Sequence, residues 1–187
     1  MATIVKNSEE GNSHSGIPEA IFLEDVDAFM QKVEDQSAEI VLRQLDEQHS
    51  KYKFMEANLT ARKRRLRNQV PDIQKSLEMI EVLKTKKEAE QDMETNFLLS
   101  ALLYSKAKIP PTSKVCLWLG ANVMLEYSLE DAEALLKKNL TAALKQETHV
   151  QDDLDFLRDQ MTTTEVNMAR VYNWDVKRRQ AAKATAS

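Results

Sequence analysis

Residues 45–80 read LDEQHSKYKFMEANLTARKRRLRNQVPDIQKSLEMI, and an apolar or aromatic side chain recurs in them at every seventh position. These positions are Leu45, Tyr52, Leu59, Leu66, Ile73 and Ile80. A spacing of seven returns a side chain to the same face of an α-helix every two turns, which is typical of a coiled coil. The repeat therefore predicts a long helix, to which we assign residues 38–94.

A coiled-coil helix carries a second apolar row beside the first, and in this tract the second row is mixed. Leu42, Val70 and Leu77 are apolar. Its polar members are His49, Glu56, Lys63 and Lys84. We expect the N-terminal half of this helix to pair loosely for that reason. Pro71 lies inside the tract without interrupting the repeat, which predicts a kink rather than a break.

A second helical tract covers residues 129–178, with apolar residues at alternating spacings of four and three. Its main positions are Val150, Leu154, Leu157, Met161, Thr164, Met168 and Val171. Ser128 followed by Asp131 has the spacing of a capping box, which predicts where the helix begins. The two tracts should form an antiparallel coiled coil. Counting along them from their connected ends places His49 and Tyr52 near Trp174.

The residues between the tracts change to the alternating pattern of β-strands. Two strands flank Gly120-Ala121-Asn122, and a three-residue loop would pair Leu119 with Val123, Leu117 with Leu125, and Val115 with Tyr127. Residues 95–99 and 102–109 predict a second hairpin, so four strands are expected within 95–127. Both faces of the later hairpin are apolar, and an isolated hairpin cannot bury both. We therefore expect other subunits to cover seven hairpin candidates: Val115, Leu117, Trp118, Leu119, Val123, Leu125 and Tyr127.

Composition limits the classes of function. The 187 residues carry a net charge of −4, which gives no general attraction to nucleic acid or to anionic membranes. No apolar run is long enough to span a bilayer, and the polar start lacks the apolar stretch of a signal peptide. A single cysteine, Cys116, excludes an intramolecular disulfide. We expect a cytoplasmic protein that can also enter the nucleus, with protein partners.

The sequence offers no constellation for catalysis. Only three glycines are present, at positions 11, 16 and 120, so neither a phosphate-binding loop nor a dinucleotide fingerprint can be built. The three histidines are scattered, and the acidic residues near Asp153 are typical of a solvated helical face. We therefore expect no catalytic residue, no cofactor, no metal site and no enzyme activity.

Two surface features allow a functional interpretation. The basic residues of 62–67 could form a nuclear-import or nucleic-acid patch, although a solvated helical face is favoured because the chain is acidic overall. The second feature is an apolar excess near the start of the first helix and the end of the second, wider than one packing row. These six client-binding candidates are Phe54, Met55, Met168, Tyr172, Trp174 and Val176. Packing against another helix and an adaptable grip for unfolded chains remain equal alternatives for them.

Three stretches of the chain resemble a known family. They are residues 45–66, residues 114–127 (KVCLWLGANVMLEY) and residues 154–179 (LDFLRDQMTTTEVNMARVYNWDVKRR). Together they resemble the alpha-class prefoldin subunits, the family of von Hippel-Lindau-binding protein. The resemblance runs from Gly16 to about Arg179, so residues 1–15 and 181–187 are expected to be disordered tails. It implies a prefoldin alpha-type domain at 35–180, preceded by a leader segment at 16–34.

The resemblance implies both a function and a set of partners. Alpha-class subunits join a heterohexamer of two alpha-class and four beta-class subunits, which captures unfolded actin and tubulin without ATP and delivers them to the cytosolic chaperonin. Relatives also bind von Hippel-Lindau protein. The resemblance implies neither a nucleic-acid nor a membrane partner. An alternative function is a coiled-coil adaptor that recruits one folded partner, in the nucleus for example, through the basic residues around Arg64.

Overall fold

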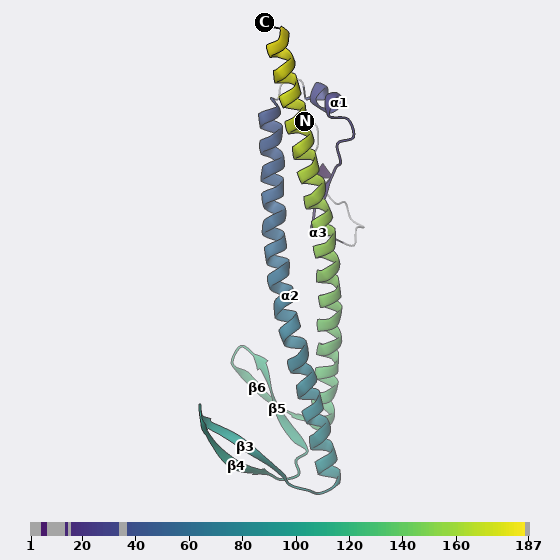
Figure 1. Cartoon of the computed structure of the whole chain (residues 1–187). Helices are drawn as coiled ribbons and strands as arrows, with labels where there is room; N and C mark the ends of the chain where they lie inside the picture. The colour runs from purple at the N-terminus through teal and green to yellow at the C-terminus, as the bar shows by residue number, and fades with distance from the viewer. Residues whose placement is uncertain (1–4, 7–13, 15, 34–36, 186–187) are drawn as a thin grey trace. The chain divides into compact units, whose positions relative to one another are not determined.

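The computed structural model describes residues 5–6, 14, 16–33 and 37–185 of the chain. Figure 1 shows two long helices, two β-hairpins between them in sequence, and a short N-terminal helix. The predicted fold class, mainly α with two hairpins of two strands each, is confirmed. The chain divides into two compact units, Met1–Arg64 with Thr148–Ser187 and Arg65–Glu147, and we describe each by itself.

The two long helices are α2 (Ala38–Glu88) and α3 (Leu129–Thr185). Pro71 lies inside α2 without ending it, as expected from the uninterrupted repeat. The predicted end of this helix at 94 is wrong. The chain leaves α2 because Glu90 has a φ of 50°, Glu90 N donates to Lys87 O (3.2 Å), and Gln91 N donates to Lys86 O (3.0 Å). This bonding is a Schellman motif, with glutamate in the place that glycine usually takes.

The helix α3 begins at the predicted residue and extends further than predicted. Ser128 Oγ accepts a hydrogen bond from Asp131 N (3.0 Å) and donates one to Asp131 Oδ2 (2.7 Å), so the capping pair is confirmed. The helix runs past the predicted end at 178 to Thr185. Residues 181–185, predicted as part of a disordered tail, are therefore helical, whereas residues 186–187 lie outside the described residues.

Four strands form two separate antiparallel hairpins. Their bounds are β3 (Met93–Ser100), β4 (Leu103–Ile109), β5 (Lys114–Gly120) and β6 (Val123–Ser128). The strands β3, β5 and β6 are one or two residues longer than predicted at some ends, whereas β4 begins one residue later than predicted. In the second hairpin, the predicted pairs of Leu117 with Leu125 and of Val115 with Tyr127 are confirmed.

The predicted pair of Leu119 with Val123 is wrong. A bulge between Trp118 and Gly120 pairs Gly120 with Val123 instead, and Gly120 has a φ of 93°. The loop is therefore two residues, Ala121 and Asn122, with φ values of 47° and 60°. Positive φ at both loop residues is the conformation that matches the twist of a tight hairpin.

The unit Arg65–Glu147 has its core where the second hairpin meets both long helices. Ile80 of α2 and Leu129 and Ala132 of α3 are buried, and Val115, Leu117 and Tyr127 of the hairpin pack against them together with Leu83 and Leu136. Alternation in β5 and β6 places these three hairpin side chains on one face. One apolar face of the hairpin is thus covered by the chain's own helices.

The other unit contains the start of α2, most of α3 and the leader. The leader includes β2 (Glu19–Ala20), which pairs with β1 (Val5–Lys6), and α1 (Val26–Lys32). Asp25 caps α1 by accepting a hydrogen bond from Ala28 N (3.0 Å). Of the predicted tail 1–15, only Val5, Lys6 and His14 are among the described residues. Residue 34 of the predicted leader and residues 35–36 of the predicted domain at 35–180 also lie outside them.

Within this unit the pairing of the two helices differs from the predicted register. His49 Nε2 lies 2.9 Å from Glu165 Oε1, and Tyr52 packs with Leu157 rather than near Trp174. Most of the shift arises because α2 ends at Glu88, six residues before the 94 from which the register was counted.

Three of the four polar positions of the second row have partners across the helix pair. His49 contacts Glu165, Lys63 Nζ donates to Gln151 Oε1, and in the other unit Lys84 Nζ donates to Glu133 Oε2. The first row behaves as predicted, since Leu45, Tyr52, Leu66 and Ile80 are buried. Polar residues in the second row therefore add cross-helix bonds to the apolar packing of the first row.

Candidate functional site

The first candidate surface is the set of hairpin faces that the chain leaves open. Of the seven hairpin candidates, Val115, Leu117 and Tyr127 pack on the helices, whereas Trp118, Leu119, Val123 and Leu125 are exposed. Trp118 pairs across the strands with Met124, and its side chain is 59% exposed.

The first hairpin is more open still. Its exposed large apolar and aromatic residues are Phe97, Leu98, Leu99, Leu102, Leu103 and Tyr104. Leu102, at the turn, is 95% exposed. Water-exposed apolar groups at this density on two-stranded sheets with free edges favour binding to further strands or apolar side chains. We refer to these exposed residues of both hairpins as the open hairpin surface.

The second candidate surface contains the six client-binding candidates, and the structure separates them. Met168 and Trp174 pack against a buried cluster formed by the leader, α2 and α3, and Met55 packs against another. Val176 is half-buried. Phe54 and Tyr172 are 70% and 55% exposed.

The two exposed candidates do not form one patch. Tyr172 lines a groove with Leu42, and Phe54 is twelve residues further along α2, a rise of about 18 Å. Their role as a grip for clients stays a prediction.

Sequence reasoning missed the leader as a structural element. Leu23, Val26 and Met30 are buried in one cluster with Val41 and Val171. The spacing of Leu23, Val26 and Met30 by three and four residues, with Asp25 before the run, is the signal that could have predicted a short amphipathic helix. The contact itself joins residues about 145 positions apart, which no local pattern reveals.

Side chains of the long helices bind the backbone of the leader. Asn167 Oδ1 accepts from Leu23 N (3.0 Å), and Asn167 Nδ2 donates to Ile21 O (2.8 Å). Tyr52 donates its hydroxyl to Pro18 O (2.7 Å). Asn167 is fully buried, so its amide depends on these partners. Burial also raises the pKa of Tyr52, which keeps its hydroxyl protonated as a donor.

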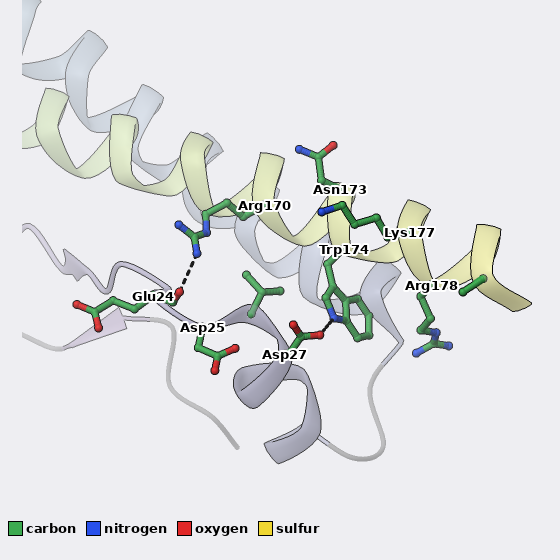
Figure 2. Close-up of a pocket in the computed structure, with 10 residues that line it drawn as sticks. Glu24, Asp25, Asp27, Arg170, Asn173, Trp174, Lys177 and Arg178 are labelled. Atoms are coloured by element: carbon green, nitrogen blue, oxygen red, sulfur yellow. Dashed lines mark hydrogen bonds between the residues drawn. The ribbon is translucent and has the colours of Figure 1, made fainter.

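Two further backbone bonds extend this contact in both directions. Gln160 Oε1 accepts from Ala20 N (2.9 Å), and Arg170 donates to Glu24 O (2.7 Å). Figure 2 shows the bond from Arg170 and a second one in which the Trp174 indole N–H donates to Asp27. Four side chains of α3 and one of α2 thus hold the segment from Pro18 to Asp27.

Opposite charges line the groove beside α1. Glu24, Asp25 and Asp27 of the leader face Arg170, Lys177 and Arg178 of α3 in Figure 2. Arg178 lies over the Trp174 ring, 5.3 Å from its centre, and Arg170 lies 5.1 Å from the Phe22 ring centre. These contacts add electrostatic and cation–π attraction to the apolar docking of the leader.

The described part of the chain offers no site for metal chemistry. No group of three His, Cys, Asp or Glu side chains among the described residues could hold a metal ion. The carboxyl group with the largest change in pKa is Glu133, held at about 2 by hydrogen bonds from Lys137 and Lys84. A carboxylate stabilised by two lysines on a helix surface is a structural ion pair rather than an acid or a base for catalysis. No helix within the described residues is long and apolar enough to cross a membrane.

Comparisons with known proteins agree with this geometry. A family model described as "Prefoldin subunit" matches residues 52–174. The chain is 60% identical to prefoldin subunit 3 of mouse over 172 residues, which cover 92% of this chain and 88% of the relative. It is 55% identical to prefoldin subunit 3 of Drosophila melanogaster over 97% of this chain and 92% of that one.

A solved structure shows the same fold. A chain from the cryo-EM structure of filamentous PFD from Methanocaldococcus jannaschii aligns with a TM-score of 0.51 at 17% identity, covering 63% of this chain and 95% of that chain. The two long helices with hairpins between them therefore have the fold of that structure. On the family match and the identity over most of its length, this chain belongs to the prefoldin family, in the group of subunit 3.

Proposed function

We propose that this prefoldin co-chaperone subunit assembles into a heterohexamer of two alpha-class and four beta-class subunits. In this hexamer the chain is one of the two alpha-class subunits. The hexamer captures unfolded actin and tubulin without ATP and delivers them to the cytosolic chaperonin. The observation that carries the proposal is the open hairpin surface, because a subunit that leaves Trp118, Leu102 and their neighbours in water is incomplete alone. The same proposal places the complex in the cytosol.

The composition of the open hairpin surface fits a permanent contact between subunits. Lasting interfaces are more apolar than transient ones and are enriched in aromatic residues and methionine. Phe97, Tyr104, Trp118 and Met124 supply that chemistry, and all four are exposed in the chain. The edges of both hairpins also offer unpaired backbone groups to neighbouring strands.

The capture of clients is supported by the exposed aromatic residues of the long helices. Phe54 and Tyr172 present rings to water, and rings of this kind contact apolar segments of many sequences. Neither residue contributes to the buried clusters of the described chain. Serine at these two positions should therefore weaken client binding without loss of the fold.

The test is co-expression of the chain with beta-class subunits, followed by native mass spectrometry and an assay of aggregation of denatured actin. We expect a hexamer containing two copies of this chain, which suppresses aggregation without ATP and releases actin to chaperonin. A stable monomer that suppresses aggregation fully by itself would contradict the assembly part of the proposal. A hexamer that protects neither actin nor tubulin would contradict the client part.

A further inference from the structure

The part of the leader before α1 is bound as an extended peptide, mainly through its backbone, and α1 follows it as a short helix. Between Pro18 and Glu24 the chain receives five hydrogen bonds from Tyr52, Gln160, Asn167 and Arg170, all of them to backbone N–H or C=O groups. Backbone groups are the same in every polypeptide. We call the surface of α2 and α3 that contacts residues 17–30 the groove. The polar contacts in it therefore do not depend on the side chains of the segment that it binds.

The apolar part of the groove selects for hydrophobic character. Ile17 is buried with Tyr52 and Leu157, and Leu23, Val26 and Met30 are buried in the cluster further along the helices. These positions call for apolar side chains at intervals along the segment. Backbone recognition combined with spaced apolar sites is the chemistry that suits an unfolded chain, which exposes both.

We propose that the groove holding residues 17–30 is a binding surface for an apolar segment of an unfolded client, and that the leader, extended before α1 and helical within it, is its resident occupant. The inference rests on the proposed function. A client segment would replace the leader on Gln160, Asn167 and Arg170 and would reach Met168 and Trp174, which the leader now covers. Because the leader belongs to the same chain, its docking competes with every client.

The experiment uses full-length chains in the assembled hexamer. One variant, Leu23→Ser with Met30→Ser, removes two buried anchors of the leader and leaves the groove intact. A second, Asp25→Ala, removes the cap of α1 without changing a side chain of α2 or α3. The matched control is Gln31→Ser, at an exposed leader position. Circular dichroism checks that each variant keeps its helix content.

Two probes are used with each hexamer. Reduced and carboxymethylated α-lactalbumin serves as a permanently unfolded chain, and a labelled peptide with the sequence of residues 17–30 (IPEAIFLEDVDAFM) reports on the groove itself. Fluorescence anisotropy gives the Kd of each. We expect both loosened variants to bind both probes more tightly, by about tenfold for the double variant, because the free groove becomes more populated. Gln31→Ser should match the wild type.

A third variant locates the effect. Adding Asn167→Leu to the double variant removes the two bonds to the backbone of the occupant, and the gain in affinity for both probes should disappear. If the loosened variants bind the unfolded chain no more tightly than the wild type, the inference is overturned. If no hexamer binds the unfolded chain but the peptide still enters the loosened groove, the proposed function fails while the groove's peptide specificity stands.

Discussion

The hairpins and the leader-bound part of the helices differ in how their apolar side chains are shielded from water. Both regions display more apolar side chains than the long helices can bury between themselves. Around Val171 the chain covers the excess with its own leader, through Leu23 and Met30. On the outer hairpin faces it leaves Trp118 and Leu102 in water. The difference leads us to propose that the hairpins, unlike the leader-bound region, take their cover from other subunits.

The two regions should also differ in how their contacts respond to mutation. Leader contacts form within one chain, so weakening them lowers the stability of that chain. Under the proposed function, hairpin contacts form between chains, so weakening them should lower the affinity of assembly and leave the isolated chain almost unchanged.

The largest effect is expected from the double substitution Trp118→Ser and Met124→Ser on the outer face of the second hairpin. These cross-strand partners are exposed in the chain, and truncating central interface residues costs about 2 kcal/mol each, or about a thousandfold in Kd together. Native mass spectrometry of co-expressed subunits should show loss of the chain from the hexamer. Asn96→Ser, at an exposed polar position of β3, is the control. Undiminished incorporation of the double variant would remove the hairpin from the interface.

A smaller effect is expected from Leu23→Ala in the leader. Leu23 is buried, and shortening a buried leucine costs about 3 kcal/mol. Chemical denaturation should show the loss in the stability of the single chain, while incorporation into the hexamer stays at the wild-type level. The neighbouring Phe22→Ala is the control, because Phe22 is exposed and should cost about 1 kcal/mol or less. Equal effects at both positions would mean that the leader is not docked as described.

Removing a polar contact should have a more moderate effect. Asn167→Ala deletes the two bonds to Leu23 N and Ile21 O, which should cost about 2 kcal/mol of leader docking. Hydrogen exchange of the amides of residues 20–23 measures the change directly. Asn173→Ala, at an exposed position six residues along the same helix, should leave the exchange unchanged. Slow exchange in the Asn167 variant would show that apolar packing alone holds the leader.

The smallest effect concerns the ion pairs of Glu133, in the unit that carries the hairpins. Lys137 and Lys84 lower its pKa from 4.5 to about 2, so the folded chain favours the ionised carboxylate. This contribution to stability is complete above pH 4.5 and is lost as the pH falls toward 2. Glu133→Gln should therefore flatten the decline in stability between these pH values, measured by urea denaturation. An identical pH profile for the variant would show that the bonds contribute nothing in solution.

Much of the fold could be predicted from the sequence because its signals are local. The spacing of seven from Leu45 to Ile80 and the alternation around Gly120 both act over a few residues. The end of α2 could not be predicted, because the left-handed residue that ends it is Glu90. A glycine at this position would have indicated the end of the helix. The bulge at Trp118 was missed because Gly120 was read as part of the loop rather than of the strand.

The candidate sites were only partly predictable, because the cover of each surface is decided by distant parts of the chain. Sequence reasoning placed Val115 and Trp118 in one group, although the first faces the helices and the second faces water. It also placed Trp174 with Tyr172, although the leader covers the first of them. The second outcome depends on contacts between the leader and α3 across more than 140 positions, which alternation and heptads do not encode.

The most direct test of the central claim is hydrogen exchange followed in the same chain, alone and in the hexamer. The account predicts that the amides of β3–β6 at the open hairpin surface exchange fast in the free chain and become protected on assembly. It predicts that the amides of Ala20 and Leu23, bonded to Gln160 and Asn167, are protected in both states. Hairpins protected in the free chain, or a leader protected only in the hexamer, would contradict it.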